Sequence, residues 1–420
     1  MKSRVLLAAI GTGGLLASIG LLLAPRSPLA LLAVLGVLLI CLTADIPKWF
    51  RWTVSFAILL FVVPGAGFQN TFLFELGIQI GIYAAMTLGL NVVVGMAGLL
   101  DLGYAAFFAI GAYTWAIFGS PQAAEFMGGT FPLPGWPYFY IFSAIAVITA
   151  AITGVIIGLP ALRLRGDYLA IVTLGLGEVV RVLANNLDHP INLTNGPQGI
   201  TPVERPPITW LTNLLDAMGV QASNAVGYGL FFYFLVFGVM GIVVLVNVRL
   251  DRSRFGRAWI AIREDEIAAR AMGISLLHTK LLAFATGAAF SGVMGSIFAA
   301  KQLFVSPESF TLLQSITILA MVILGGMGSI RGAILGAAAV TLLNIEVLKS
   351  LSDFLNDLRQ SGFILNLGFF KYNFATLSSQ LEPAKYERMI FGIILILMML
   401  FRPQGMIPEK RHKMELEKDG

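Results

Sequence analysis

The residues of this chain that could take part in chemistry are few, and they lie within apolar stretches. Glu178 and Arg181 are three positions apart, so on a helix they share a face and can form an ion pair. Asp101 lies between Gly98 and Gly103. A charge in an apolar segment is a functional candidate, because burying it without a partner is costly. We favour a structural pair for Glu178 and Arg181, whereas Asp101 is either a solvated turn residue or part of the lining of a path.

Motifs of the common enzyme classes are absent from the sequence. The chain has no Gly-x-x-x-x-Gly-Lys-Ser/Thr loop to hold a nucleotide phosphate, no His-Glu-x-x-His and no Gly-x-Ser-x-Gly. Its three histidines are too scattered to suggest a metal site, and its single cysteine, Cys41, cannot form a disulfide within the chain. We therefore expect no catalytic residue, no metal, no cofactor and no enzymatic activity on this chain.

The composition indicates what must position these residues. Of the 420 residues, 57% are hydrophobic and only 12% are charged, whereas a soluble domain carries roughly a quarter of its residues as charges. This excludes a soluble enzyme, a disordered protein and a disulfide-stabilised scaffold. Because a spanning helix needs about 20 mostly apolar residues, the apolar segments predict an all-α polytopic membrane protein with about ten to twelve transmembrane helices.

Lys and Arg residues set the orientation of these spans, because they are enriched in cytoplasmic loops. Residues 249–280 contain seven Lys or Arg against four Asp or Glu, whereas residues 186–224 contain one against three. We therefore place the first loop inside and the second outside, and counting spans then places both termini in the cytoplasm. Arg163, Arg165 and Asp167 fall at a cytoplasmic helix end as orientation anchors. Such loops account for the net charge of +5, so we expect no nucleic-acid partner.

Two glycine-rich runs, 95–112 and 325–337, resemble each other and indicate an internal pseudo-repeat. In transporters, related halves often contribute broken helices that meet at a substrate path. Small residues also let membrane helices pack closely, so packing alone is an equally good interpretation. If the runs are discontinuous and line a path, its candidate residues are Asn91, Gly95, Gly98, Asp101, Gly103, Tyr104, Gly325, Gly326 and Gly328.

The strongest local pattern is the amphipathic stretch 256–273 in the cytoplasmic loop. Trp259 and Ile262 are three positions apart, and Ile267 and Ala271 are four apart, so each pair shares a helix face. The remaining residues carry both signs of charge, whereas a helix that lies on lipid headgroups favours Lys and Arg alone. We predict one short helix that docks on a cytoplasmic protein through charged residues that include Arg263, Glu264, Asp265 and Glu266.

This stretch resembles the coupling loop of ABC-importer permeases, in which Ala268, Ala269 and Gly273 match the family pattern and Glu266 lies one residue early. Five further segments resemble the M-type permease subunit of branched-chain amino-acid importers, and the resemblance covers roughly residues 75–410. These segments are residues 88–104, 162–175, 305–310, 323–329 and 402–405. The outer loop departs from the family at Asn195, where glycine is usual.

The resemblance implies a domain organisation of N-terminal apolar spans (1–70), a permease domain (71–410) with its coupling loop at 249–280, and a cytoplasmic tail (411–420). It implies a bacterial inner-membrane protein that pairs with a homologous second permease. Two cytoplasmic ATPases would bind ATP and Mg²⁺, and a solute-binding protein would dock outside near Asn195, Gly196 and Gly199. The expected cargo is a branched-chain or other neutral amino acid. The alternatives are a urea or amide ABC permease and an ion-coupled secondary transporter.

Overall fold

The computed structural model describes residues 2–23, 28–43, 47–162, 164, 166–219, 223–361, 364–366, 371–373, 383–402 and 404–407. Two of the predicted anchors, Arg163 and Arg165, and the predicted tail 411–420 lie outside the described residues. The chain forms two compact units, one of residues 1–80 and 338–403 and the other of residues 81–337 and 404–420. The chain passes between the units within α5 and α16, which are the helices Phe72–Asn91 and Ile330–Leu342.

The described residues are predominantly helical, and the predicted all-α polytopic class is confirmed. Seven helical segments are long and apolar enough to cross a membrane, and four shorter apolar helices accompany them within the described part of the chain. The expected ten to twelve spans include these shorter apolar helices. The seven long segments are Phe72–Met96, Gly135–Ala161, Tyr168–Asn186, Asn224–Asp251, Leu276–Gln302, Pro307–Gly325 and Ile330–Asp357.

The first unit contains the start of α5, the end of α16 and elements from the N- and C-terminal parts of the chain. These are α1 (Lys2–Leu23), α2 (Pro28–Thr43), α3 (Lys48–Ala57), η1 (Ile58–Val62), α4 (Val63–Gly67), η6 (Leu343–Val347), α17 (Leu348–Gln360), η9 (Pro383–Tyr386) and α18 (Glu387–Phe401). A short antiparallel hairpin pairs β1 (Ile364–Asn366) with β2 (Lys371–Asn373).

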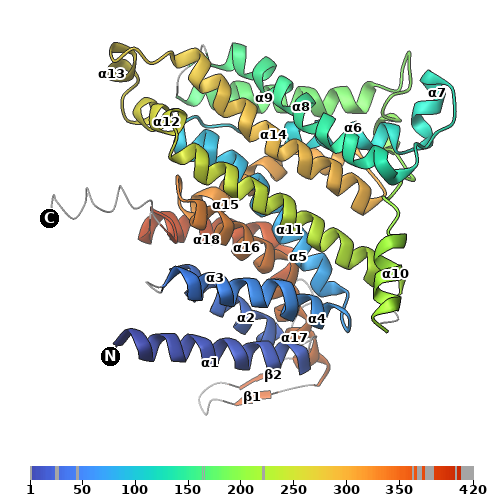
Figure 1. The fold of residues 1–420 in the computed structure, drawn as a ribbon. Helices are drawn as coiled ribbons and strands as arrows, with labels where there is room; N and C mark the ends of the chain where they lie inside the picture. Colours follow the sequence, from blue (N-terminus) through green and yellow to red (C-terminus); the bar gives the residue numbers. More distant parts are fainter. Residues whose placement is uncertain are drawn as a thin grey trace. The chain divides into compact units, whose positions relative to one another are not determined.

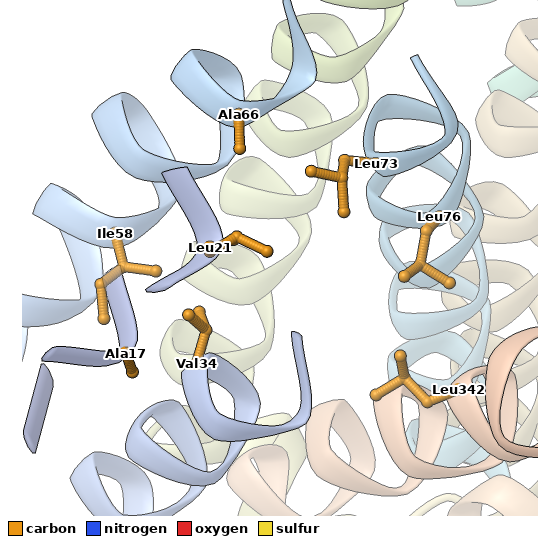
Figure 2. Close-up of a cluster of buried hydrophobic side chains, with 8 residues drawn as sticks. All are labelled: Ala17, Leu21, Val34, Ile58, Ala66, Leu73, Leu76 and Leu342. Carbon is orange, nitrogen blue, oxygen red and sulfur yellow. The ribbon is translucent and has the colours of Figure 1, made fainter. Parts of the chain in front are cut away.

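Aliphatic side chains from five helices and one π-helical turn form the core of the first unit. Figure 2 shows Leu21 of α1, Val34 of α2 and Leu342 of α16 within this cluster. Leucine, valine and isoleucine at these positions bury side chains with few polar requirements, which suits a core between apolar helices. The cluster consists of Ala17, Leu21, Val34, Ile58, Ala66, Leu73, Leu76 and Leu342.

The second unit holds the remaining helices, and Figure 1 labels the α-helices among them. They are η2 (Val92–Met96), α6 (Ala105–Phe118), η3 (Pro121–Ala123), α7 (Ala124–Met127), α8 (Gly135–Ala161), α9 (Asp167–Asn186), η4 (Gly196–Gln198), α10 (Thr209–Ala217), α11 (Asn224–Asp251), α12 (Arg254–Glu264), α13 (Glu266–Ala271), α14 (Leu276–Gln302), η5 (Pro307–Phe310) and α15 (Leu312–Gly325).

Helix α14 is central to this unit and packs closely against α6 and α8 (Figure 1). A Cβ added at Gly111 of α6 would collide with the backbone of Gly292 in α14, and one added at Gly292 would collide with Ala146 of α8. Glycine at both positions therefore lets three apolar helices approach at backbone distance, as small residues do between membrane helices.

Candidate translocation path and coupling loop

Both glycine-rich runs interrupt helices. The first helix passes from α5 into the π-helical turn η2 and stops at Met96, and α6 begins at Ala105. The second break separates α15, which ends at Gly325, from α16, which begins at Ile330. Non-helical backbone at membrane depth is tolerated where it is buried in protein or lines a cavity. The discontinuities expected from the glycines are therefore present in the fold.

The two breaks lie against each other. The Asn91 Oδ1 atom accepts a hydrogen bond from the backbone N–H of Gly328 at 2.8 Å. A Cβ at Gly95 would collide both with Asn91 Oδ1 and with the Gly328 nitrogen. Asn91 is fully buried, so its amide joins two segments that are more than two hundred residues apart in the sequence. Three of the residues proposed to line a path are thus brought together.

The second break is closed by residues from near the end of the described chain. The backbone N–H groups of Met406 and Ile407 donate to the carbonyl oxygens of Leu324 and Gly325 at 2.9 and 3.0 Å. Gly326 has a φ of +115° and lies directly against Gly405 and Ile407. Sequence reasoning used residues 402–405 only to recognise the family and missed this role, because nothing local indicates a contact with residues 324–326.

Asp101 and its neighbours fix the segment between η2 and α6. Asp101 is only 1% exposed, and its Oδ1 atom accepts from the Gly103 N–H at 2.9 Å. The Leu102 N–H donates to Thr173 Oγ1 at 3.1 Å, and the Tyr104 hydroxyl donates to the carbonyl oxygen of Gly287 at 2.8 Å. The burial excludes a solvated turn residue, and the segment is held against both α9 and α14.

The coupling loop differs from the single helix predicted over 256–273. Asp265 has extended backbone angles, with φ −152° and ψ 109°, and it separates α12 from α13. Its Oδ1 atom accepts from the N–H groups of Ile267 and Ala268 at 2.8 and 3.0 Å. Aspartate is a favoured N-cap because it satisfies amides that have no partner within the helix. The prediction of one helix was wrong because this cap starts a second one.

The inner face of the loop packs against the start of α14. Trp259 is fully buried, and its Nε1 atom donates to the carbonyl oxygen of Thr279 at 2.7 Å. Glu266 Oε2 lies 3.0 Å from the ammonium group of Lys280, whose side chain is 7% exposed. Ile262 and Ala269 form a buried cluster with Leu276 of α14. The apolar face predicted through Trp259 and Ile262 is therefore present.

The outer face of the coupling loop is exposed and mixes apolar with acidic residues. Ile267 and Met272 are 75% and 83% exposed, and the Glu264 side chain is 67% exposed. Ile267 and Ala271 both lie on this exposed side of α13. Of the other predicted coupling residues, Asp265 and Ala268 are exposed, and Gly273, with a φ of +84°, follows the end of α13.

Arg263 faces inward, toward the first break, although the sequence suggested a contact with a partner protein. Its Nη1 atom donates to the carbonyl oxygen of Gly95 at 2.6 Å, and its Nη2 atom lies 3.1 Å from Glu264 Oε1. Gly98 has a φ of +69°, and a Cβ built there would lie 2.8 Å from Arg263 Cγ. Arg263 thus places the coupling loop in direct contact with the first break.

In α9, Arg181 pairs with Glu178 as predicted, and its Nη1 atom also lies 2.9 Å from Glu308. Asn195 has a φ of +57°, and its Nδ2 atom donates to the carbonyl oxygen of Gly199 at 2.8 Å. Asparagine is one of the few residues that adopt this left-handed conformation readily. Asn195 therefore supports a left-handed turn that glycine would also adopt.

A small cavity lies between the start of α6, the middle of α9 and the start of α15. Three of the side chains that line it are polar, and the other lining residues are apolar or glycine. The lining residues are Leu102, Gly103, Ala105, Ala106, Leu174, Gly177, Glu178, Phe310, Thr311, Leu312 and Ser315. Within the described ranges, no group of three or more His, Cys, Asp or Glu side chains could hold a metal ion.

Comparison with known families gives the decisive match. The family described as the permease component of branched-chain amino acid transport systems matches residues 72–399. The chain belongs to this family. The match begins at α5 and includes both glycine breaks and the coupling loop. The chain is therefore a permease subunit of a membrane importer, and its relatives are transport subunits rather than enzymes.

Individual relatives agree with this assignment. The chain is 38% identical over 346 residues to the high-affinity branched-chain amino acid transport system permease protein LivM of Escherichia coli, covering 80% of this chain and 70% of that protein. It is 25% identical to the probable LivM of Methanocaldococcus jannaschii, covering 79% and 91%. A shorter match, 32% over 125 residues, is to the autoinducer 2 import system permease protein LsrC of Klebsiella pneumoniae. No solved structure gives a significant match.

Proposed function

We propose that this permease subunit carries branched-chain or similar neutral amino acids inward across a bacterial inner membrane, driven by ATP hydrolysis on partner subunits. The functional assembly would contain a homologous second permease, two cytoplasmic ATPases that bind ATP and Mg²⁺, and an extracytoplasmic solute-binding protein. Both termini of this chain would lie in the cytoplasm.

The observation that carries the proposal is that the coupling loop has one face packed against α14 and another face exposed. Its inner face is anchored on α14 by Trp259 and by the Glu266–Lys280 pair. Its outer face presents Ile267 and Met272 to solvent beside Glu264 and Asp265. A short amphipathic helix with such a face is suited to a groove on a protein partner. An ion-coupled transporter that works alone has no need of this surface.

The cargo is proposed from the chemistry of the breaks and from the named relatives. The breaks contain several glycines and the uncharged amide of Asn91, which accepts from the Gly328 N–H. Such a lining favours a neutral substrate with an apolar side chain over a cationic one. Urea and short amides are the competing cargo class, because they too are neutral and small.

The test is reconstitution of the chain in proteoliposomes with its second permease, its ATPases and its binding protein. We expect uptake of radiolabelled leucine that requires ATP on the ATPase side and the binding protein on the other. The uptake should persist when a protonophore and a sodium ionophore are added. Uptake that collapses with an ionophore and ignores ATP would contradict the proposal. Competition by excess urea or acetamide, but not by valine, would assign the cargo to the amide class instead.

Docking of the binding protein is proposed for the turn at residues 195–199. The Asn195–Gly199 hydrogen bond and the left-handed conformations of Gly196 and Gly199 fix its shape. The antiparallel bridge between Ile200 and Val305 ties the turn to the segment before η5. We therefore expect that docking of a partner on this turn is transmitted to the start of α15.

A further inference from the structure

The Arg263 side chain points away from the exposed face of the coupling loop, and its guanidinium group contacts the last turn of η2. The final carbonyl groups of a helix have no partner within the helix, and they form the negative end of its dipole. The carbonyl oxygen of Gly95 is such a group, and Arg263 Nη1 donates to it at 2.6 Å. A hydrogen bond from a charged donor is shorter and stronger than a neutral one. The contact is therefore a specific link between α12 and η2.

The aliphatic part of the Arg263 side chain also makes a close contact, with the turn at Gly98. Gly98 turns the chain with a φ of +69°, and the place of its missing side chain is taken by Arg263 Cγ. The Arg263 side chain is 26% exposed. A movement of the end of α12 therefore has to move both the Gly95 carbonyl group and the turn at Gly98.

The link continues from the first break to the second. Gly95 lies directly against Asn91 Oδ1 and the nitrogen of Gly328, and these two atoms share a hydrogen bond of 2.8 Å. Arg263, Gly95, Asn91 and Gly328 thus form one contiguous set of contacts. Side chains and hydrogen bonds in contact are the physical means by which distant sites can be coupled.

The attachment of the loop to α14 does not depend on Arg263. Trp259 donates to the Thr279 carbonyl oxygen, and Glu266 pairs with Lys280. Removing the Arg263 side chain should therefore leave the loop in place on α14 while releasing η2. This separation makes a positioning role distinguishable from a role in folding.

We propose that Arg263 is a positioning residue that passes movement of the coupling loop to both glycine breaks through the Gly95 carbonyl group. The proposal rests on the proposed function, since it assumes that the coupling loop is the element moved by the ATPases. It adds the route by which that movement reaches the path. It also assigns Arg263 to the inside of this chain rather than to the surface that contacts a partner.

The first readout does not require transport. Hydrogen exchange of the backbone amides of residues 92–103 is measured by mass spectrometry on the purified full chain in lipid nanodiscs. Arg263→Ala should speed this exchange by at least about tenfold, the order expected when a charged hydrogen bond is lost from a local opening equilibrium. Arg257→Ala is the matched control, because Arg257 is an exposed arginine of the same helix that donates to the Arg252 carbonyl oxygen instead. It should leave this exchange unchanged.

The second readout is made in the reconstituted importer. Arg263→Ala should retain the ATPases on co-purification and retain ATP hydrolysis, while leucine uptake per ATP falls by about tenfold or more. Arg263→Lys keeps the charge but not the planar donor geometry. It should fall between the wild type and Arg263→Ala in both readouts. It also serves as the variant for study if Arg263→Ala does not fold.

Wild-type exchange at residues 92–103 in Arg263→Ala would overturn the link, and faster exchange with unchanged uptake per ATP would overturn its role in coupling. A wild-type importer without ATP-dependent uptake would instead refute the proposed function, and with it the transport part of this proposal. The exchange measurement would still decide whether Arg263 holds η2.

Discussion

Arg263 and Gly95 are 168 positions apart in the sequence, yet the guanidinium group of one donates to the carbonyl oxygen of the other at 2.6 Å. This contact joins the two features that the sequence presents separately, an amphipathic cytoplasmic stretch and a glycine-rich interruption. A single side chain, that of Arg263, therefore connects the loop proposed to contact the ATPases with the break proposed to line the path.

Gly95→Ala should reduce both stability and uptake. The new methyl group would collide with Asn91 Oδ1 and the Gly328 nitrogen, and overpacking of this kind costs about 1–3 kcal/mol. The measurement is thermal unfolding in detergent together with leucine uptake. Gly238→Ala in α11 is the control, because no atom lies within 4 Å of a Cβ built there. An equal effect of the two substitutions would contradict the close approach of the breaks.

Glu266→Gln should destabilise the coupling loop, because it leaves the buried ammonium group of Lys280 without its charged partner. Breaking a fully buried pair costs several kcal/mol, but Glu266 is 29% exposed, so we expect about 1–3 kcal/mol. The double variant Glu266→Gln/Lys280→Met should lose less than Glu266→Gln alone, because no charge is then left buried. The free energy of unfolding of the wild type and of the two variants decides this, and a double variant that loses as much as Glu266→Gln or more would argue against the pair.

Asp265→Ala should fray α13 while leaving α12 intact. The substitution removes the side-chain oxygen that accepts from the N–H groups of Ile267 and Ala268, and loss of an N-cap costs about 0.5–2 kcal/mol. Faster hydrogen exchange over residues 266–271, with weaker co-purification of the ATPases, is the expected result. Asp265→Asn, which keeps the accepting oxygen, should behave like the wild type. Loss of binding in both variants would point to the charge rather than to the cap.

Asn195→Gly should be tolerated better than Asn195→Ala. The residue has a φ of +57°, a conformation that costs an ordinary residue roughly 1–2 kcal/mol and glycine almost nothing. We expect Asn195→Ala to lower the melting temperature and to weaken stimulation of uptake by the binding protein. Titration of that protein against both variants measures the second effect. Identical behaviour of the two would show that the turn does not depend on its left-handed residue.

Much of the fold followed from the sequence, because the apolar length of a segment is a local property. The helix breaks at Gly98 and Gly326 and the Glu178–Arg181 pair were likewise predicted from spacing. The start of a second helix at Asp265 was missed, although aspartate before Glu266 is a recognisable N-cap. The inward direction of Arg263 could not be predicted, because its partner is a backbone carbonyl group, which every residue carries and no sequence pattern marks.

The closing of the second break by residues 404–407 has a consequence for synthesis and for engineering. These residues leave the ribosome after α18, whereas the carbonyl groups of Leu324 and Gly325 that they bind are made long before. Until then the backbone around Gly326 lacks its neighbours Gly405 and Ile407. A shortened chain that ends at Phe401 therefore contains all seven long apolar segments of the described residues, yet the second break lacks the contacts of residues 404–407. Fusion partners should be attached after residue 407 through a spacer, so that the contacts of residues 404–407 with the second break are kept.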